Sequence, residues 1–99
     1  MTMCTVRPLS QPRFEALLYR RSPWVEFIFD AKEWWSNTDE SLIAVLGLDL
    51  IDRDYSWVAL GRDETGVFRG VDVNTSLADL DTARANLHQR LFELSAGQA

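Results

Sequence analysis

The sequence has very little of the residue types on which disulfide, zinc and triad chemistry depend. Among its 99 residues there is one cysteine, Cys4, and one histidine, His88. A single cysteine can neither close a disulfide within the chain nor build a cysteine-rich zinc site. A catalytic triad needs a histidine between a nucleophile and an acid, and no neighbouring serine lies on a sharp strand-to-helix turn. We therefore expect His88 to be an ordinary solvated side chain.

Long apolar runs are missing as well. The longest, Leu42–Leu48, is far shorter than the roughly 20 residues that a membrane-spanning helix needs. The segment 1–10 has no apolar run of the length found in signal peptides. The sequence therefore predicts a cytoplasmic protein that does not contact a membrane.

Basic residues are scarce in the middle of the chain. The net charge is −5, and residues 30–81 alone balance at −8, because twelve acids stand there against four basic residues. The segments on either side, 1–29 and 82–99, balance at +2 and +1. An acidic surface repels a phosphate backbone. The charge distribution therefore disfavours direct binding to nucleic acid.

The overall composition is that of a folded domain. Hydrophobic residues make up 46% of the chain and charged residues 25%, which is unlike the composition of disordered segments. A chain of this length can bury one modest core, and its four tryptophans supply much core area per residue. We expect a single domain over residues 1–99, with residues 1–9 as a loosely ordered lead-in.

The N-terminal part is predicted to be helical, with one ambiguous segment. Pro12 after Ser10 suits the first turn of a helix, and this helix should end before Pro23. Residues 22–31 also begin like a helix, because Ser22 can cap it and a proline follows. The same residues alternate like a strand. We favour the helix and keep the strand as the alternative.

The middle of the chain predicts an antiparallel meander. The predicted strands are Glu33–Ser36, Leu42–Ile51, Tyr55–Arg62 and Val67–Val73. The second of them is apolar on both faces, which predicts a central strand that is covered on both sides. Gly66 ends the last hairpin loop, where a positive φ is commonly needed. Residues 74–76 are expected to leave the sheet.

The last element is predicted to be an amphipathic helix. Its apolar stripe consists of Leu80, Ala83, Leu87, Leu91 and Leu94. Asp79 is a suitable N-cap, Asp81 lies near the positive end of the helix dipole, and Gly97 can supply a left-handed C-terminal cap. The sequence thus predicts a two-layer α+β fold. A three- or four-stranded antiparallel β-meander packs against the C-terminal helix, with one or two short N-terminal helices.

Carboxylates on and between the strands raise the alternative of a metal-dependent hydrolase or nuclease. Asp30-Ala31-Lys32 matches a D-x-K pattern of nucleases, but no aspartate precedes Asp30 to supply the acid that such enzymes carry on the preceding strand. Mg²⁺ prefers converging carboxylates. The residues that could serve this alternative are Asp30, Lys32, Asp49 and Asp72.

The turn acids argue against a metal. The run Asp49-x-x-Asp52-x-Asp54 lacks the glycine and terminal glutamate of a calcium loop. The acids of this turn and those at 63–64 fall at opposite ends of the strand Tyr55–Arg62, so they cannot all converge. Solvated turn carboxylates are the ordinary case. We therefore expect no metal, no cofactor and no catalytic residue.

The tryptophans are the remaining functional signal. In a strand, Trp34 and Trp35 point to opposite faces, so one can enter the core while the other needs a second layer, a partner or water. Trp57 is expected in the core. Tryptophan is enriched at interface hot spots, which makes Trp35 a candidate anchor. Completion of a small core is an equally good explanation for these rings.

Together these features favour a non-enzymatic protein-binding domain. We expect an accessory or inhibitory protein that occupies a basic, nucleic-acid-binding surface of a partner protein. The candidate partner-binding residues are Trp35, Asp39, Glu40, Asp52, Asp54, Asp63 and Glu64. A homodimer joined through an edge strand stays open as a further alternative.

Overall fold

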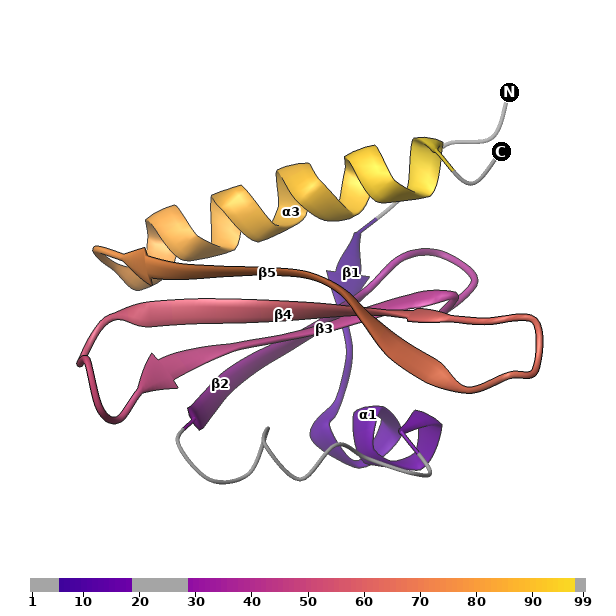
Figure 1. Cartoon of the computed structure of the whole chain (residues 1–99), viewed down its shortest axis with the longest axis horizontal. Helices are drawn as coiled ribbons and strands as arrows, with labels where there is room; N and C mark the ends of the chain where they lie inside the picture. The colour runs from indigo at the N-terminus through magenta and orange to yellow at the C-terminus, as the bar shows by residue number, and fades with distance from the viewer. Residues whose placement is uncertain (1–5, 19–28, 98–99) are drawn as a thin grey trace.

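Five antiparallel strands form one sheet in the order of the chain, and a long helix crosses one face of it (Figure 1). The computed structural model describes residues 6–18 and 29–97. The elements are β1 (Arg7–Pro8), α1 (Gln11–Leu17), β2 (Phe29–Ser36), β3 (Leu42–Asp49), β4 (Tyr55–Arg62), β5 (Phe68–Leu77) and α3 (Leu80–Ala96). The predicted α+β class, the antiparallel sheet and the C-terminal helix are confirmed. The predicted number of strands was too small.

The additional strand comes from the segment that was expected to be a loose lead-in. Arg7 and Pro8 of β1 pair with Ser36 and Trp35 of β2. Proline is tolerated there because an edge strand needs no ladder hydrogen bond on its outer side. A strand of two residues is too short to show a periodic pattern in the sequence, so it can be identified only from its pairing with β2 in the structure.

α1 begins as the sequence predicted. The hydroxyl of Ser10 accepts a hydrogen bond from the backbone N–H of Arg13 at 3.2 Å, and Pro12 lies in the first turn. The helix ends at Leu17, and the predicted stop at Pro23 falls outside the described residues. One short N-terminal helix is therefore present in the described part of the chain.

The ambiguous segment 22–31 is a strand where the structure describes it. Residues 29–31 belong to β2, where Asp30 pairs with Leu48 and Ala31 with Gly47. The helix prediction is wrong for these residues, because pairing with the central strand outweighs the local capping signal. Residues 22–28 lie outside the described part of the chain.

The core has one layer on each face of the sheet. The layer toward α3 contains Leu42, Ala44, Leu46, Trp57, Ala59, Ala83, Leu87 and Leu91. The opposite layer contains Phe14, Leu18, Ile43, Val45, Val58 and Leu60. Since α1 lies on the face opposite α3 (Figure 1), the predicted two-layer arrangement is wrong. The prediction that β3 is central and covered on both sides is confirmed.

The β3–β4 turn begins earlier than predicted. β3 ends at Asp49, whose Oδ1 accepts the backbone N–H groups of Ile51 at 2.8 Å and Asp52 at 3.1 Å. Arg53 completes the turn with φ at 63°, a left-handed conformation. A carboxylate that satisfies the following N–H groups stabilises a turn over a continuing strand. Leu50 and Ile51 therefore leave the sheet instead of extending β3.

β5 continues beyond its predicted end at Val73. Asn74 pairs with Trp57 and Leu77 pairs with Tyr55, so residues 74–76 do not leave the sheet. Two register shifts interrupt the β4–β5 pairing, and Ser76 has φ at 63°. Such irregularities bend an edge strand and hinder its pairing with another chain.

α3 confirms the predicted N-terminal cap but not the C-terminal one. The Asp79 carboxylate accepts the N–H of Thr82 at 2.7 Å, and Ala83, Leu87 and Leu91 are fully buried. Gly97 has φ at −72°, so the expected left-handed cap is wrong. None of the described helices is long and apolar enough to cross a membrane.

Candidate functional site

The seven predicted partner-binding residues do not form one surface. Asp39 and Glu40 lie in the β2–β3 turn and Asp63 and Glu64 in the β4–β5 loop, at one end of the sheet. The other two acids lie in the β3–β4 turn. The register separates the two ends by the six residue steps from Leu42 to Leu48, which is about 20 Å along a strand.

Trp35, the remaining member of the set, lies between the two ends and against the inner side of α3. Its indole N–H donates a hydrogen bond to Glu33 at 3.0 Å, and its ring meets the His88 ring edge-on with centroids 4.1 Å apart. Arg84 holds the same glutamate through a bidentate ion pair. Trp35 is therefore a partly buried component of the core rather than a projecting anchor.

At the end of the sheet with the β2–β3 and β4–β5 loops, the acids of these loops are matched in number by nearby arginines. The four loop acids are Asp39, Glu40, Asp63 and Glu64, and the four arginines are Arg7, Arg13, Arg62 and Arg69. Arg13 pairs with Glu40 at 2.6 Å, and Arg69 pairs with Asp63 at 2.8 Å. Two of the four loop acids, Glu40 and Asp63, therefore already have cationic partners.

The pKa values at this end follow from these contacts. The Arg13 guanidinium lowers the pKa of Glu40, and hydrogen bonds from Thr65 and Arg69 lower the pKa of Asp63 well below its ordinary value. All of these pairs are exposed, so each adds little to the free energy of unfolding. Their main effect is to remove net negative charge from this end of the sheet.

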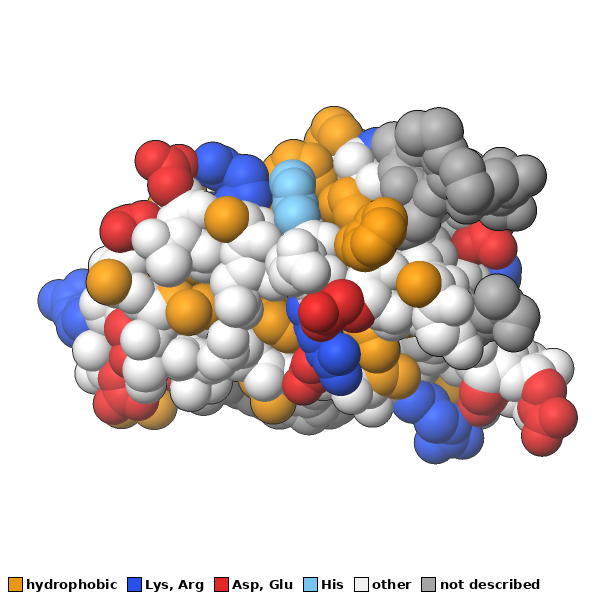
Figure 2. All heavy atoms as spheres, turned by 90° about the horizontal axis from the view of Figure 1, so that it is seen from above, with side chains coloured by type: hydrophobic (Ala, Val, Ile, Leu, Met, Phe, Trp, Pro, Cys, Tyr) orange, Lys and Arg blue, Asp and Glu red, His pale blue; other side chains and the backbone are white. Residues whose placement is uncertain are grey.

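The opposite end retains an excess of negative charge. It carries six aspartates, namely Asp30, Asp49, Asp52, Asp54, Asp79 and Asp81. Two basic residues, Lys32 and Arg53, belong to the same end, and Arg84 is shared between Asp81 and Glu33. Figure 2 shows acidic and basic side chains next to each other at both ends of the α3 face. The β3–β4 turn carries three of the six aspartates and one of these basic residues, Arg53.

Within this turn two apolar side chains project into solvent beside the acids. Ile51 is 69% exposed and Leu50 is 50% exposed. Asp49, Asp52 and Asp54 each place a carboxylate oxygen within 4.8 Å of the others. We name these five residues, 49–52 and 54, the acidic tip. The apolar part of the tip was not predicted, because the apolar pattern of the sequence placed Leu50 and Ile51 in the preceding strand.

The residues considered for a metal-dependent enzyme are held apart. Asp72 lies opposite Ala59, which lies opposite Ala44, five residues before Asp49 and therefore about 16 Å away along the sheet. Asp30 is paired with Lys32 at 2.8 Å, and Asp49 is occupied by the N–H groups of its turn. This set of side chains does not converge on one point.

His88 differs from the solvated side chain that the sequence predicted. Its ring packs against Trp35, and its Nε2 is enclosed without a hydrogen-bond partner among the described residues. Burial, followed by the nearby positive charge of Arg84, lowers the pKa of His88, and Glu33 opposes this shift. The folded protein therefore resists protonation of this ring.

We expect acidification to destabilise the fold through His88. An unfolded histidine binds its proton near pH 6.5, whereas the folded ring binds it only at lower pH. The contribution of neutral His88 is therefore complete above pH 6.5 and is lost as the pH falls below that value, by at most about 1.4 kcal/mol per pH unit. Urea unfolding at pH 7.5, 6.5 and 5.5 measures this loss. In His88→Gln the free energy of unfolding should depend less on pH over this range. An unchanged pH dependence would contradict the role of His88.

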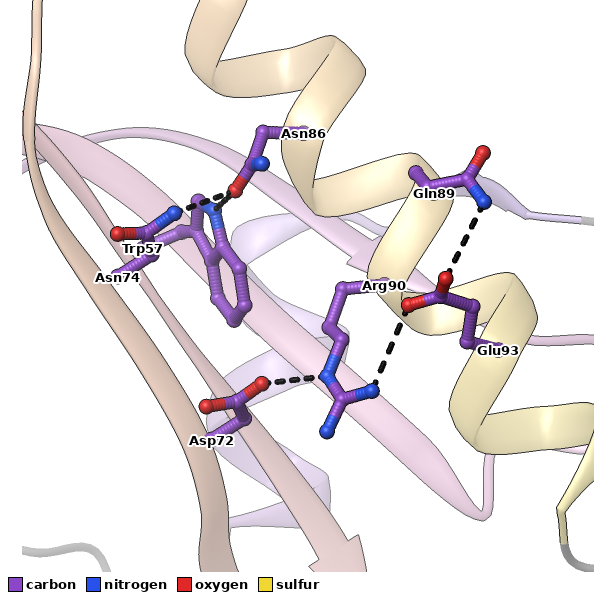
Figure 3. Close-up of a pocket in the computed structure, with 7 residues that line it drawn as sticks. All are labelled: Trp57, Asp72, Asn74, Asn86, Gln89, Arg90 and Glu93. Carbon is purple, nitrogen blue, oxygen red and sulfur yellow. Dashed lines mark hydrogen bonds and ion pairs between the residues drawn. The ribbon is translucent and has the colours of Figure 1, made fainter.

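A concave feature lies between α3 and β5 (Figure 3). It is a pocket of about 240 Å³, lined by Trp57, Asp72, Asn74, Asn86, Gln89, Arg90 and Glu93. The Trp57 indole N–H donates to Asn86 Oδ1 at 2.9 Å, and Arg90 Nε donates to Asp72 Oδ2 at 2.5 Å. The sequence suggested Asp72 as a residue of the alternative metal-dependent enzyme, and in the structure its side chain lines this pocket.

Comparisons of the chain with protein-family models, with curated proteins and with solved structures each found no match.

Proposed function

We propose that the chain is a small, non-enzymatic protein-binding domain that uses its acidic tip to occupy a basic surface of a partner protein. A nucleic-acid-binding groove is such a surface, because it presents lysine and arginine side chains to phosphates. The single observation that carries the proposal is the exposure of Ile51 and Leu50 in the middle of a turn rich in aspartate.

The apolar residues give the tip a source of affinity. Full burial of an isoleucine or leucine side chain contributes about 1.5–3 kcal/mol. A projecting side chain that enters a recess at the centre of an interface is the common form of a hot spot. Ile51, with 69% of its surface exposed, is the most exposed of the large apolar side chains in the described part of the chain.

The acids give the tip its selectivity for a basic partner. Three carboxylates within 4.8 Å repel one another, and a lysine or arginine of the partner relieves this repulsion. Complementary charge also accelerates association and makes it sensitive to salt. The tip thus combines an apolar contact, which supplies affinity, with a charge pattern that selects the partner.

The backbone of the tip is held in place before any partner arrives. The N–H of Asp49 donates to the carbonyl of Asp54 at 2.8 Å, and the N–H of Arg53 donates to the carbonyl of Asp49 at 2.9 Å. The Asp49 side chain adds its two hydrogen bonds to the turn. A preorganised turn loses less conformational entropy on binding than a mobile loop does.

The alternatives have weaker support. The carboxylates considered for a hydrolase are engaged with Lys32, Arg90 or turn N–H groups, and Asp72 lies far from Asp49 along the sheet. A homodimer through the edge strand β5 is hindered by its two register shifts. In the acidic tip, by contrast, Leu50, Ile51 and Asp52 are exposed, and its three aspartates stand against one basic residue of the same turn, Arg53.

Site-specific crosslinking tests the proposal. A photoreactive amino acid at Ile51 should trap one discrete, basic protein in an extract of the cells that make this chain. The same group at Val67, which is 37% exposed at the other end of the sheet, is the matched control. We expect trapping from position 51 only. It should fall steeply as the salt concentration rises, because exposed charges are screened at high ionic strength.

Three results would contradict the proposal. Equal trapping from positions 51 and 67 would show that the acidic tip is not the contact site. Trapping that does not change with the salt concentration would show that charge does not contribute to the binding. A crosslink to a second copy of this chain would replace the proposal with the homodimer.

A further inference from the structure

The hydrogen bonds of the pocket between α3 and β5 define which of its groups can receive a ligand. An indole N–H can only donate, so the atom of Asn86 that faces Trp57 must be its oxygen. That oxygen also accepts from Nδ2 of Asn74 at 2.7 Å. The side-chain oxygen of Asn74, a residue that lines the pocket, is therefore left without a partner among the described residues, and Figure 3 shows it on the side of the amide that is turned away from Asn86.

Asp72 adds a carboxylate two residues away on the same side of β5. One of its oxygens accepts from Arg90 at 2.5 Å and the other accepts from the N–H of Val73 at 2.9 Å. A carboxylate has about four acceptor positions, so two of them stay open. The wall that β5 contributes to the pocket therefore has open acceptor positions on both Asp72 and Asn74, beside one N–H of the Asn74 amide.

The charges of the pocket do not cancel. Arg90 is bound by Asp72 and, at 3.4 Å, by Glu93, so one cation stands against two carboxylates. The helix wall also carries the amide nitrogen of Asn86, which has no hydrogen-bond partner among the described residues. A ligand that is rich in donors at one end and has a carbonyl at the other would match both walls.

We infer that this pocket binds one guanidinium or ammonium side chain, with an arginine side chain as the preferred occupant. Its volume of about 240 Å³ is below the roughly 300 Å³ at which small-molecule sites begin, so it suits one side chain better than a cofactor. The five N–H donors of a guanidinium meet the acceptors of Asp72 and Asn74, and the backbone carbonyl of the same residue meets Asn86. This site lies on α3 and β5 and does not depend on the acidic tip.

Titration followed by ¹⁵N NMR tests the inference on the whole chain. The indole N–H of Trp57 lies at the base of the pocket and gives a resolved signal that responds to changes at Asn86. We expect Nα-acetyl-arginine amide to shift this signal saturably. The citrulline analogue, which has the same shape without the charge, should bind about tenfold more weakly, since charge-assisted hydrogen bonds are the stronger ones. A parallel titration uses free arginine. Tighter binding of Nα-acetyl-arginine amide than of free arginine would indicate that the natural ligand is an arginine within a peptide.

Two variants locate the site. Asp72→Asn should weaken the arginine derivative about tenfold, whereas Asp81→Asn, which alters an exposed aspartate that also pairs with an arginine of α3, should leave it unchanged. Asn74→Leu is the second test in case Asp72→Asn fails to fold. The inference is overturned by an absence of saturable shifts, by equal affinity of the citrulline analogue, or by unchanged binding in Asp72→Asn and Asn74→Leu. Ile51→Ser should not affect this titration, so the proposed function and this inference can fail separately.

Discussion

Leu87→Ala is expected to lower the free energy of unfolding by about 2–5 kcal/mol. Leu87 is fully buried at the centre of the α3 stripe, between Ala83 and Leu91. Its removal leaves a cavity above β3 and β4 that the surrounding side chains can fill only in part. A domain of this size has a total stability of about 5–15 kcal/mol, so the loss removes a large share of it. The midpoint of urea unfolding, followed by tryptophan fluorescence, measures the effect.

Phe92→Ala is the matched control on the same helix. Phe92 is 52% exposed and does not belong to the described core clusters. We expect its replacement to change the free energy of unfolding by no more than about 0.5 kcal/mol, as for most surface substitutions. Equal effects of the two substitutions would mean that α3 is not held to the sheet through the predicted stripe.

The elements with strong local patterns could be predicted from the sequence. The spacing of Ala83, Leu87 and Leu91 defined the buried face of α3, and the aspartate before them defined its start. β4 matched its predicted bounds because turn-forming residues stand on both sides of it. The double apolar character of β3 predicted that both of its faces are covered. These features are determined by residues that are close together in the sequence, so they can be predicted from one sequence alone.

The errors concern elements that depend on distant partners. β1 exists because Arg7 and Pro8 find β2 some 28 residues further along the chain. The start of β2 was taken for a helix because its pairing with β3 is not visible in local propensity. β5 was ended at Val73 because polar residues follow. An edge strand tolerates them, since one of its sides faces solvent.

The site shows the same division. The sequence placed acids in three turns, and the structure agrees with these positions. It could not reveal that Glu40 pairs with Arg13, 27 residues away, whereas Asp52 has no ion pair among the described residues. Nor could it show that Trp35 is held against His88. The net charge of a sequence segment is therefore a poor guide to the net charge of a surface, because arginines from distant segments pair with some of the acids and leave others unpaired.

Ile51→Ser is expected to weaken binding to the trapped partner by about 10- to 100-fold. The burial of an isoleucine contributes about 1.5–3 kcal/mol, and each 1.4 kcal/mol corresponds to a factor of ten in affinity. The free protein should be as stable as before, because this side chain is 69% exposed and makes no core contact in the described structure. The two properties separate a binding residue from a structural one. Isothermal titration at low salt measures the affinity.

Val67→Ser provides the comparison, because it removes an exposed apolar side chain from the other end of the sheet. We expect it to leave the affinity within a factor of about two, as for residues outside a hot spot. Asp52→Asn should have an intermediate effect that disappears at high salt, since it changes charge and not apolar area. Should Ile51→Ser bind as tightly as the unaltered chain, the apolar contact is not made, and charge alone would have to account for the affinity. The salt dependence of Asp52→Asn then shows whether the tip contacts the partner at all.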